Sequence, residues 1–95
     1  EDKNGEEQDS DIISAGLYFE MSLVCRAMDN LQGSLVNISQ ALKLEPNNPR
    51  YLDAKLEISI MNKDKISALD AYEKLAEVNP ENQKLKELKG QVDEL

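Results

Sequence analysis

The stretch Ala-Leu-Lys-Leu-Glu-Pro-Asn-Asn at residues 41–48 returns as Leu-Ala-Glu-Val-Asn-Pro-Glu-Asn at residues 75–82. The offset that takes Pro46 to Pro80 also relates residues further upstream: Ser34 to Ala68, Leu35 to Leu69 and Ile38 to Tyr72. Because the match covers a whole apolar stretch as well as a proline turn, it indicates an internal repeat. Its period of about 34 residues fits one helical hairpin per repeat.

Apolar residues recur at three- and four-residue steps along most of the chain, which predicts helices and no strand. The first helix is expected over about residues 11–29. Its core stripe is expected to hold Ile13, Leu17, Met21, Val24 and Met28. The second helix must end before Pro46, because the residue that precedes a proline avoids the α-helical region.

Three further helices are expected beyond Pro46. Asn48 followed by Pro49 predicts an N-cap with proline at the first helical position, which opens the third helix. That helix is expected to end at residues 62–64. The fourth helix carries Ile66, Leu69, Tyr72, Leu75 and Ala76, and Asn79-Pro80 is expected to repeat the cap and open the fifth. The fifth helix places Leu85, Leu88, Val92 and Leu95 on one stripe. Leu42 and Leu69, in the second and fourth helices, are expected to be core residues.

This repeat resembles the tetratricopeptide (TPR) family, whose packing residues recur with a period of about 34 residues and end on a proline. In the first repeat, at about residues 15–48, the matching positions hold Tyr18, Met21, Ser22, Cys25, Ser34, Ile38, Ala41 and Pro46. In the second, at about residues 49–82, they hold Leu52, Lys55, Leu56, Ser59, Ala68, Tyr72, Leu75 and Pro80. The resemblance implies an all-α fold, a right-handed α-solenoid fragment of two helix-turn-helix repeats with a capping helix at about residues 80–95. Lys55 and Ser59 depart from the family, which usually has apolar residues there.

Charge is distributed unevenly along the 95 residues, whose net charge is −8. Six acids and a single lysine fall within residues 1–11, so an acidic tail is expected over residues 1–10, disordered as far as residue 9. The helical domain is then expected over residues 11–95. Nucleic acid is not an expected partner, because no stripe of Lys and Arg is present to contact phosphates.

The residues needed for most catalytic and metal sites are missing from the sequence. Histidine is absent, and the single Cys25 has neither a disulfide partner nor a histidine to activate it. We therefore expect no enzyme activity, metal or other cofactor, and Cys25 is expected to pack as a small apolar residue. No signal peptide or membrane-spanning run is present, so membrane insertion is not expected and an intracellular location is favoured. The start at Glu1 instead of Met predicts a piece of a longer protein.

The resemblance implies a function in protein interaction, because the first helix of each TPR repeat lines a concave groove. The positions that match this groove are Phe19, Leu23, Arg26, Asp53, Glu57 and Ile60. The expected ligand is a peptide or helix of another protein. The family's chaperone receptors grip a terminal carboxylate with Lys, Asn and Arg, but only Lys84 of the matching positions is kept here, so an apolar or basic-apolar ligand is expected instead.

Phe19 and Leu23 lie four residues apart and are predicted to form an apolar interaction surface. Two alternatives remain open at this point. The pair can instead pack against a preceding repeat, another copy of the chain or the edge at residues 12–13. The whole module can also be the structural end of a longer array or a self-associating unit, a homo-oligomer, and not a receptor for a peptide.

Overall fold

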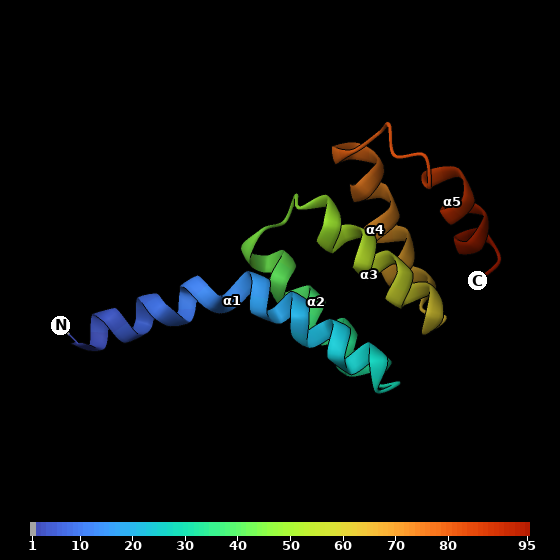
Figure 1. The fold of residues 1–95 in the computed structure, drawn as a ribbon. Helices are drawn as coiled ribbons and strands as arrows, with labels where there is room; N and C mark the ends of the chain where they lie inside the picture. Colours follow the sequence, from blue (N-terminus) through green and yellow to red (C-terminus); the bar gives the residue numbers. More distant parts are fainter. Residues whose placement is uncertain (1) are drawn as a thin grey trace.

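The computed structural model describes the backbone of residues 2–95 and the side chains of residues 15–95. All regular structure in this part of the chain is helical, as predicted, and it comprises five helices (Figure 1). Their bounds are α1 Asp2–Ala27, α2 Leu31–Leu44, α3 Pro49–Met61, α4 Lys65–Val78 and α5 Leu85–Asp93.

Each helix packs mainly on the helices next to it in the chain, so α1 and α2 form one hairpin and α3 and α4 form another. Two hydrophobic clusters hold these elements together. The first joins α1, α2 and α3 through Ala15, Leu35, Ile38, Ala41, Tyr51, Ala54 and Ile58. The second joins α3, α4 and α5 through Leu52, Leu56, Ala68, Ala71, Leu75, Leu88 and Val92. Leu42 is half-buried and packs against both clusters.

The turns inside the two hairpins have the same backbone geometry. Asp29 and Lys63, which lie one repeat period apart, both have left-handed backbones, with φ of 63° and 57°. The next residue in each turn donates its N–H to a carbonyl five residues earlier: Asn30 to Cys25 at 2.7 Å and Asp64 to Ser59 at 2.9 Å. The repeat in the sequence is therefore also a repeat in hydrogen bonding.

The helix caps follow the same period. The side chain of Asn30 accepts a hydrogen bond from the N–H of Gly33 at 3.0 Å, and that of Asp64 accepts one from the N–H of Ser67 at 3.1 Å. Hydrogen bonds from the Ser67 N–H and hydroxyl stabilise the Asp64 carboxylate and lower its pKa. Each second helix thus begins on a side-chain cap that satisfies a free backbone donor.

The expected boundaries of α2 and α3 are confirmed. α2 ends at Leu44, before Pro46. Asn48 caps α3 by accepting hydrogen bonds from the N–H groups of Arg50 at 2.9 Å and Tyr51 at 3.4 Å, and Pro49 is the first helical residue.

The two ends of the chain differ from the sequence-based boundaries. α1 begins at Asp2, so the structure continues the helix through most of the expected acidic tail; Glu1 lies outside the described residues. Acidic residues near a helix N-terminus interact favourably with the helix dipole, an effect that composition alone does not capture.

The capping helix α5 begins at Leu85 and not at Pro80. Asn79 closes α4, since its N–H donates to the Leu75 carbonyl at 2.8 Å. The residue equivalent to Asn48 is Asn82, which accepts a hydrogen bond from the Lys84 N–H at 2.9 Å and so forms the turn that precedes α5.

The buried face of α1 is not the predicted stripe. Leu17, Met21, Val24 and Met28 are exposed to 44%, 40%, 57% and 73%. Small and aromatic residues face α2 and α3 instead, among them Ala15, Phe19 and the fully buried Ser22. The hydroxyl of Ser34 on α2 donates to the Ser22 carbonyl at 2.7 Å, a contact that requires a small residue on each helix.

The same correction applies to α4. Leu69, a predicted core residue, is 38% exposed, and Ile66 is 83% exposed. Leu75, which the sequence also placed on the apolar stripe, is fully buried together with Ala68 and Ala71. Alanines on this face allow α4 to approach α3 more closely than leucines would, because the distance between packed helices depends on side-chain size.

Candidate functional site

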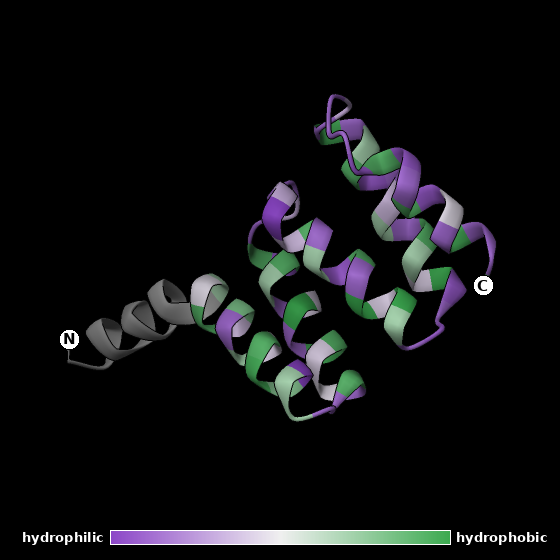
Figure 2. Cartoon of the chain, turned by 45° about the vertical axis from the view of Figure 1, so that its right-hand side comes forward, coloured by the Kyte–Doolittle hydropathy of each residue, from purple (hydrophilic) through white to green (hydrophobic). Residues whose placement is uncertain are grey.

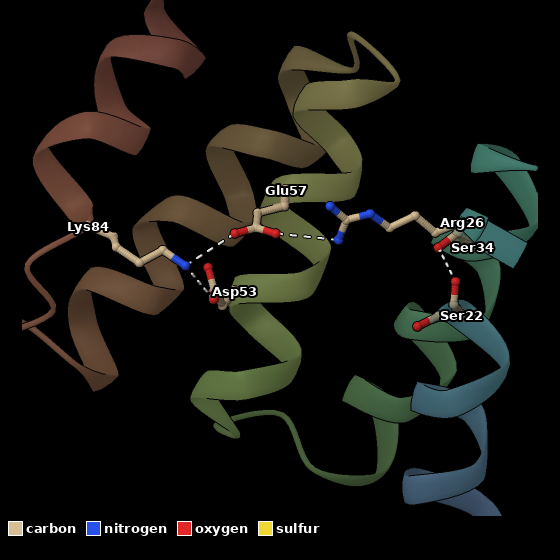
Figure 3. Close-up of polar contacts among 6 residues, drawn as sticks. All are labelled: Ser22, Arg26, Ser34, Asp53, Glu57 and Lys84. Atoms are coloured by element: carbon tan, nitrogen blue, oxygen red, sulfur yellow. Dashed lines mark hydrogen bonds and ion pairs between the residues drawn. The ribbon is translucent and has the colours of Figure 1, made fainter. Parts of the chain in front are cut away.

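Four charged residues from different parts of the chain meet on one side of the molecule, and we call Arg26, Asp53, Glu57 and Lys84 the ion-paired surface (Figure 3). Arg26 Nη1 on α1 lies 3.4 Å from Glu57 Oε1 on α3. Lys84 Nζ, just before α5, lies 3.2 Å from Glu57 Oε2 and 3.1 Å from Asp53 Oδ2. Glu57 therefore bridges two cations that come from opposite sides of α3.

The ion-paired surface is partly open to solvent. The side chains of Asp53 and Glu57 are 30% and 33% exposed, whereas that of Lys84 is 51% exposed. Hydrogen bonds to Asp53 and then to Glu57 raise the pKa of Lys84, because both carboxylates favour the charged amine. Lys84 is thus firmly cationic near neutral pH.

A hollow of about 260 Å³ lies beside this surface. Its lining comes from α1, α3, α5 and the residue before α5: Arg26, Glu57, Ile60, Met61, Lys84, Glu87, Leu88 and Gln91. Charged groups and apolar side chains therefore line one depression. Such a mixture suits a ligand that has an apolar side chain between polar groups.

The structure brings most of the predicted groove residues together. Arg26, Glu57 and Ile60 line the hollow, and Asp53 joins them through Lys84. Phe19 does not line the hollow: it is half-buried, and its ring packs on Tyr51 at a centroid distance of 5.1 Å and against the first hydrophobic cluster. Leu23 is 40% exposed but is not among the residues that line the hollow. The predicted surface formed by Phe19 and Leu23 is therefore divided between core and solvent.

Lys84 was expected only as the one kept position of the family's carboxylate clamp, and its ion pairs with Asp53 and Glu57 were not predicted. A signal was present, because Asp53 and Glu57 lie four residues apart on α3, on the same side of the helix. Two acids on one helix face favour a cation from a neighbouring element.

A second exposed feature runs along α1, and we call Leu17, Met21, Val24 and Met28 the α1 face. Figure 2 shows that apolar residues are frequent along the described part of α1, whereas the hydrophilic share is larger in α5. None of the residues of the α1 face lines the hollow. The α1 face and the hollow are therefore separate surfaces.

Other kinds of site have little support in the described residues. Cys25 is half-buried, and its sulfur accepts a hydrogen bond from the Asn37 amide at 3.6 Å. No group of three or more His, Cys, Asp or Glu residues with a metal-binding arrangement occurs in this part of the chain. Among the described helices, none has both the length and the apolar character needed to cross a membrane.

Comparison with known proteins gives no relative: no protein-family model, curated protein or solved structure matches this chain.

Proposed function

We propose that this chain is a non-catalytic protein interaction module of the tetratricopeptide type, which binds a peptide or helix of a partner protein along the side formed by α1, α3 and α5. The hollow of about 260 Å³ is the observation that carries this proposal. Both hairpins and α5 contribute to it, so a ligand there would contact every packing unit of the molecule.

The tetratricopeptide type is supported by the turns and caps that recur with the period of the sequence repeat. It is also supported by the contact between Ser22 and Ser34, which are two of the positions that match the family pattern in the first repeat. These features concern packing, so they support the architecture more strongly than they support any particular ligand.

The chemistry of the hollow favours a ligand with an apolar side chain next to a Lys or Arg. Ile60, Met61 and Leu88 offer apolar contacts. Glu57 is held only by exposed or half-exposed cations, so a basic group of the ligand can replace one of them at little cost.

The test begins with short random peptides selected on the immobilised chain, whose affinities are then measured by fluorescence anisotropy. We expect Met61→Ser and Glu57→Gln to weaken binding of the selected peptides by about tenfold or more, since each removes a contact inside the hollow. Met61 is 46% exposed, so its substitution should leave the fold intact.

Two matched variants serve as controls outside the hollow. Ile66→Ser removes an aliphatic side chain that is 83% exposed on α4, and Glu77→Gln removes a carboxylate whose side chain is 72% exposed. Both should bind the peptides as the wild type does. Equal binding by the Met61→Ser and wild-type proteins would show that the hollow is not the site.

A further inference from the structure

The α1 face is an apolar stripe without a cover in the described part of the chain. Its residues follow one another at steps of four, three and four, which places them along one side of the helix. Val24 and Met28 are exposed to 57% and 73%. An exposed apolar stripe of this kind commonly marks a contact surface.

The internal repeat allows the exposure of Val24 to be compared with that of the equivalent residues on other helices. Val24, Ile58 and Val92 are related by successive repeat periods and lie on α1, α3 and α5. Ile58 is fully buried and Val92 is 1% exposed. Only the copy on α1 is open to solvent.

A second series of residues gives the same result. Leu17, Tyr51 and Leu85 are also separated by one repeat period each. Tyr51 is 7% exposed, and Leu85 is half-buried against the second hydrophobic cluster, whereas Leu17 is 44% exposed. Two of the four positions of the α1 face, those of Leu17 and Val24, are therefore equivalent to positions that are covered twice within this chain.

In both covered cases the preceding amphipathic helix provides most of the cover, and Phe19 on α1 also packs on Tyr51. α2 covers α3 with Leu35, Ile38 and Ala41, and α4 covers α5 with a face that includes Ala71 and Leu75. Each cover thus combines aliphatic residues with small ones. By equivalence, the α1 face fits a helix whose stripe has the same composition.

Charge indicates the nature of the remaining residues of that helix. The chain has a net charge of −8, and six of its acids lie in residues 1–11, which precede the α1 face. Glu20, which lies within the same stretch of α1, is exposed. A second copy of the chain would bring a further net charge of −8, whereas a basic helix would be attracted.

We propose that the α1 face binds an amphipathic helix of a partner protein, with aliphatic and small residues toward α1 and Lys or Arg at its polar positions. This helix occupies the place that α2 takes on α3 and α4 takes on α5. The surface is separate from the hollow, so its occupation does not depend on the function proposed above.

The probe is a synthetic helical peptide with Leu and Ala at three- and four-residue spacing and Lys at the other positions, and its binding is followed by fluorescence anisotropy. We expect it to bind the wild-type protein, and we expect Leu17→Ser/Val24→Ser to weaken binding by about tenfold or more. Val24→Ser/Met28→Ser, at the two most exposed positions of the face, should do the same. Circular dichroism melting establishes that both variants are folded.

The controls show whether the α1 face itself holds the peptide. Ile66→Ser removes an equally apolar exposed residue far along the chain, and Met61→Ser lies in the hollow; neither should change binding of the helical peptide. A peptide with Ser in place of Leu measures attraction by charge alone, and one with Glu in place of Lys tests the sign of the charge. Both should bind at least about tenfold more weakly.

Several results would overturn the proposal. One is equal binding of the Lys peptide by the wild type and both α1-face variants. Another is binding of the Ser peptide or the Glu peptide to the wild type as tightly as the Lys peptide binds. Sedimentation equilibrium provides a further one: a wild-type dimer that dissociates in the Leu17→Ser/Val24→Ser variant would identify a second copy as the occupant. Equal binding of the selected peptides by the wild type and the hollow variants would overturn only the function proposed above and would leave this proposal standing.

Discussion

Ser59 is a fully buried residue whose hydroxyl has no hydrogen-bond partner among the described residues. A buried polar group without a partner costs about 1–3 kcal/mol of folding free energy. We therefore predict that Ser59→Ala raises the free energy of unfolding by about 1 kcal/mol, because it removes the hydroxyl and leaves only a small space. Urea denaturation followed by circular dichroism measures this change.

Ser34 provides the matched control, because it is equally buried but its hydroxyl donates to the Ser22 carbonyl. Ser34→Ala should lower the free energy of unfolding by about 1 kcal/mol. If Ser59→Ala destabilises the protein as much as Ser34→Ala does, the hydroxyl of Ser59 has a partner in solution, and the prediction fails.

Lys63 has a φ of 57°, in the left-handed region that glycine adopts more readily than other residues. We predict that Lys63→Gly raises the free energy of unfolding by about 0.5–1 kcal/mol, since relief of the backbone strain exceeds the entropy cost of glycine. Thermal melting detects this as an increase in Tm. Lys65→Gly, in the first turn of α4, should lower Tm instead; a Tm decrease in both variants would contradict the prediction.

At the scale of the helix, the buried face of α4 can be tested by truncation. Leu75 is fully buried and Leu69 is 38% exposed. Leu75→Ala should lower the free energy of unfolding by about 2–5 kcal/mol, whereas Leu69→Ala should cost about 1 kcal/mol or less because it leaves no enclosed cavity. Equal losses in the two variants, measured by urea denaturation, would show that α4 is rotated about its axis relative to this structure.

The positions of helices α2 and α3 could be predicted because local signals determine them. Asn48 and Pro49 favour a helix start independently of tertiary contacts, and Pro46 prevents α2 from continuing. The start of α5 was less predictable, because Asn79 and Asn82 both precede it and only the hydrogen bonds distinguish a C-cap from a turn.

The buried faces of α1 and α4 could not be predicted in this way. α1 carries two neighbouring apolar stripes, and periodicity alone does not decide which of them meets α2. The buried one includes Ala15 and Ser22, because close packing between helices requires small residues there. Hydrophobicity scales favour burial of the larger Leu17 and Val24, but both of these side chains are exposed to solvent.

Helix register brings three of the predicted groove residues together. Arg26, Glu57 and Ile60 line one hollow because they occupy corresponding sides of α1 and α3. Phe19 lies away from this hollow, because a tertiary contact with Tyr51 holds its ring against the first hydrophobic cluster. The ion pairs of Lys84 also depend on tertiary packing, since its partners are on another helix; the spacing of Asp53 and Glu57 indicates a cation beside them but does not identify it.

At the scale of the whole molecule, Lys84 links α3 to the segment before α5. Lys84→Gln should lower the free energy of unfolding by about 1 kcal/mol or less, because the lysine side chain is 51% exposed and solvent weakens the ion pairs. The pKa of Lys84 is raised in the folded state. Its contribution is therefore fully present below the ordinary lysine pKa of about 10.4 and is lost as the pH rises through the higher folded value.

Urea denaturation of the wild type and of Lys84→Gln across this pH range measures the contribution of Lys84 to the free energy of unfolding. The difference between wild type and Lys84→Gln should stay constant from neutral pH to about pH 9.5 and shrink above about pH 10.5. Comparison with the variant cancels the titration of the other lysines and tyrosines. A difference that shrinks on acidification instead would mean that the carboxylates, and not the amine, control this link.

The packing of each helix on its neighbours in the chain has a consequence for folding speed. Contacts between adjacent helices form without the closure of long loops, so little chain entropy is lost before each contact stabilises the structure. Helical proteins with such local contacts fold in microseconds to milliseconds. This chain should therefore refold within that range after dilution from urea, and one hairpin can serve as the template on which the next forms.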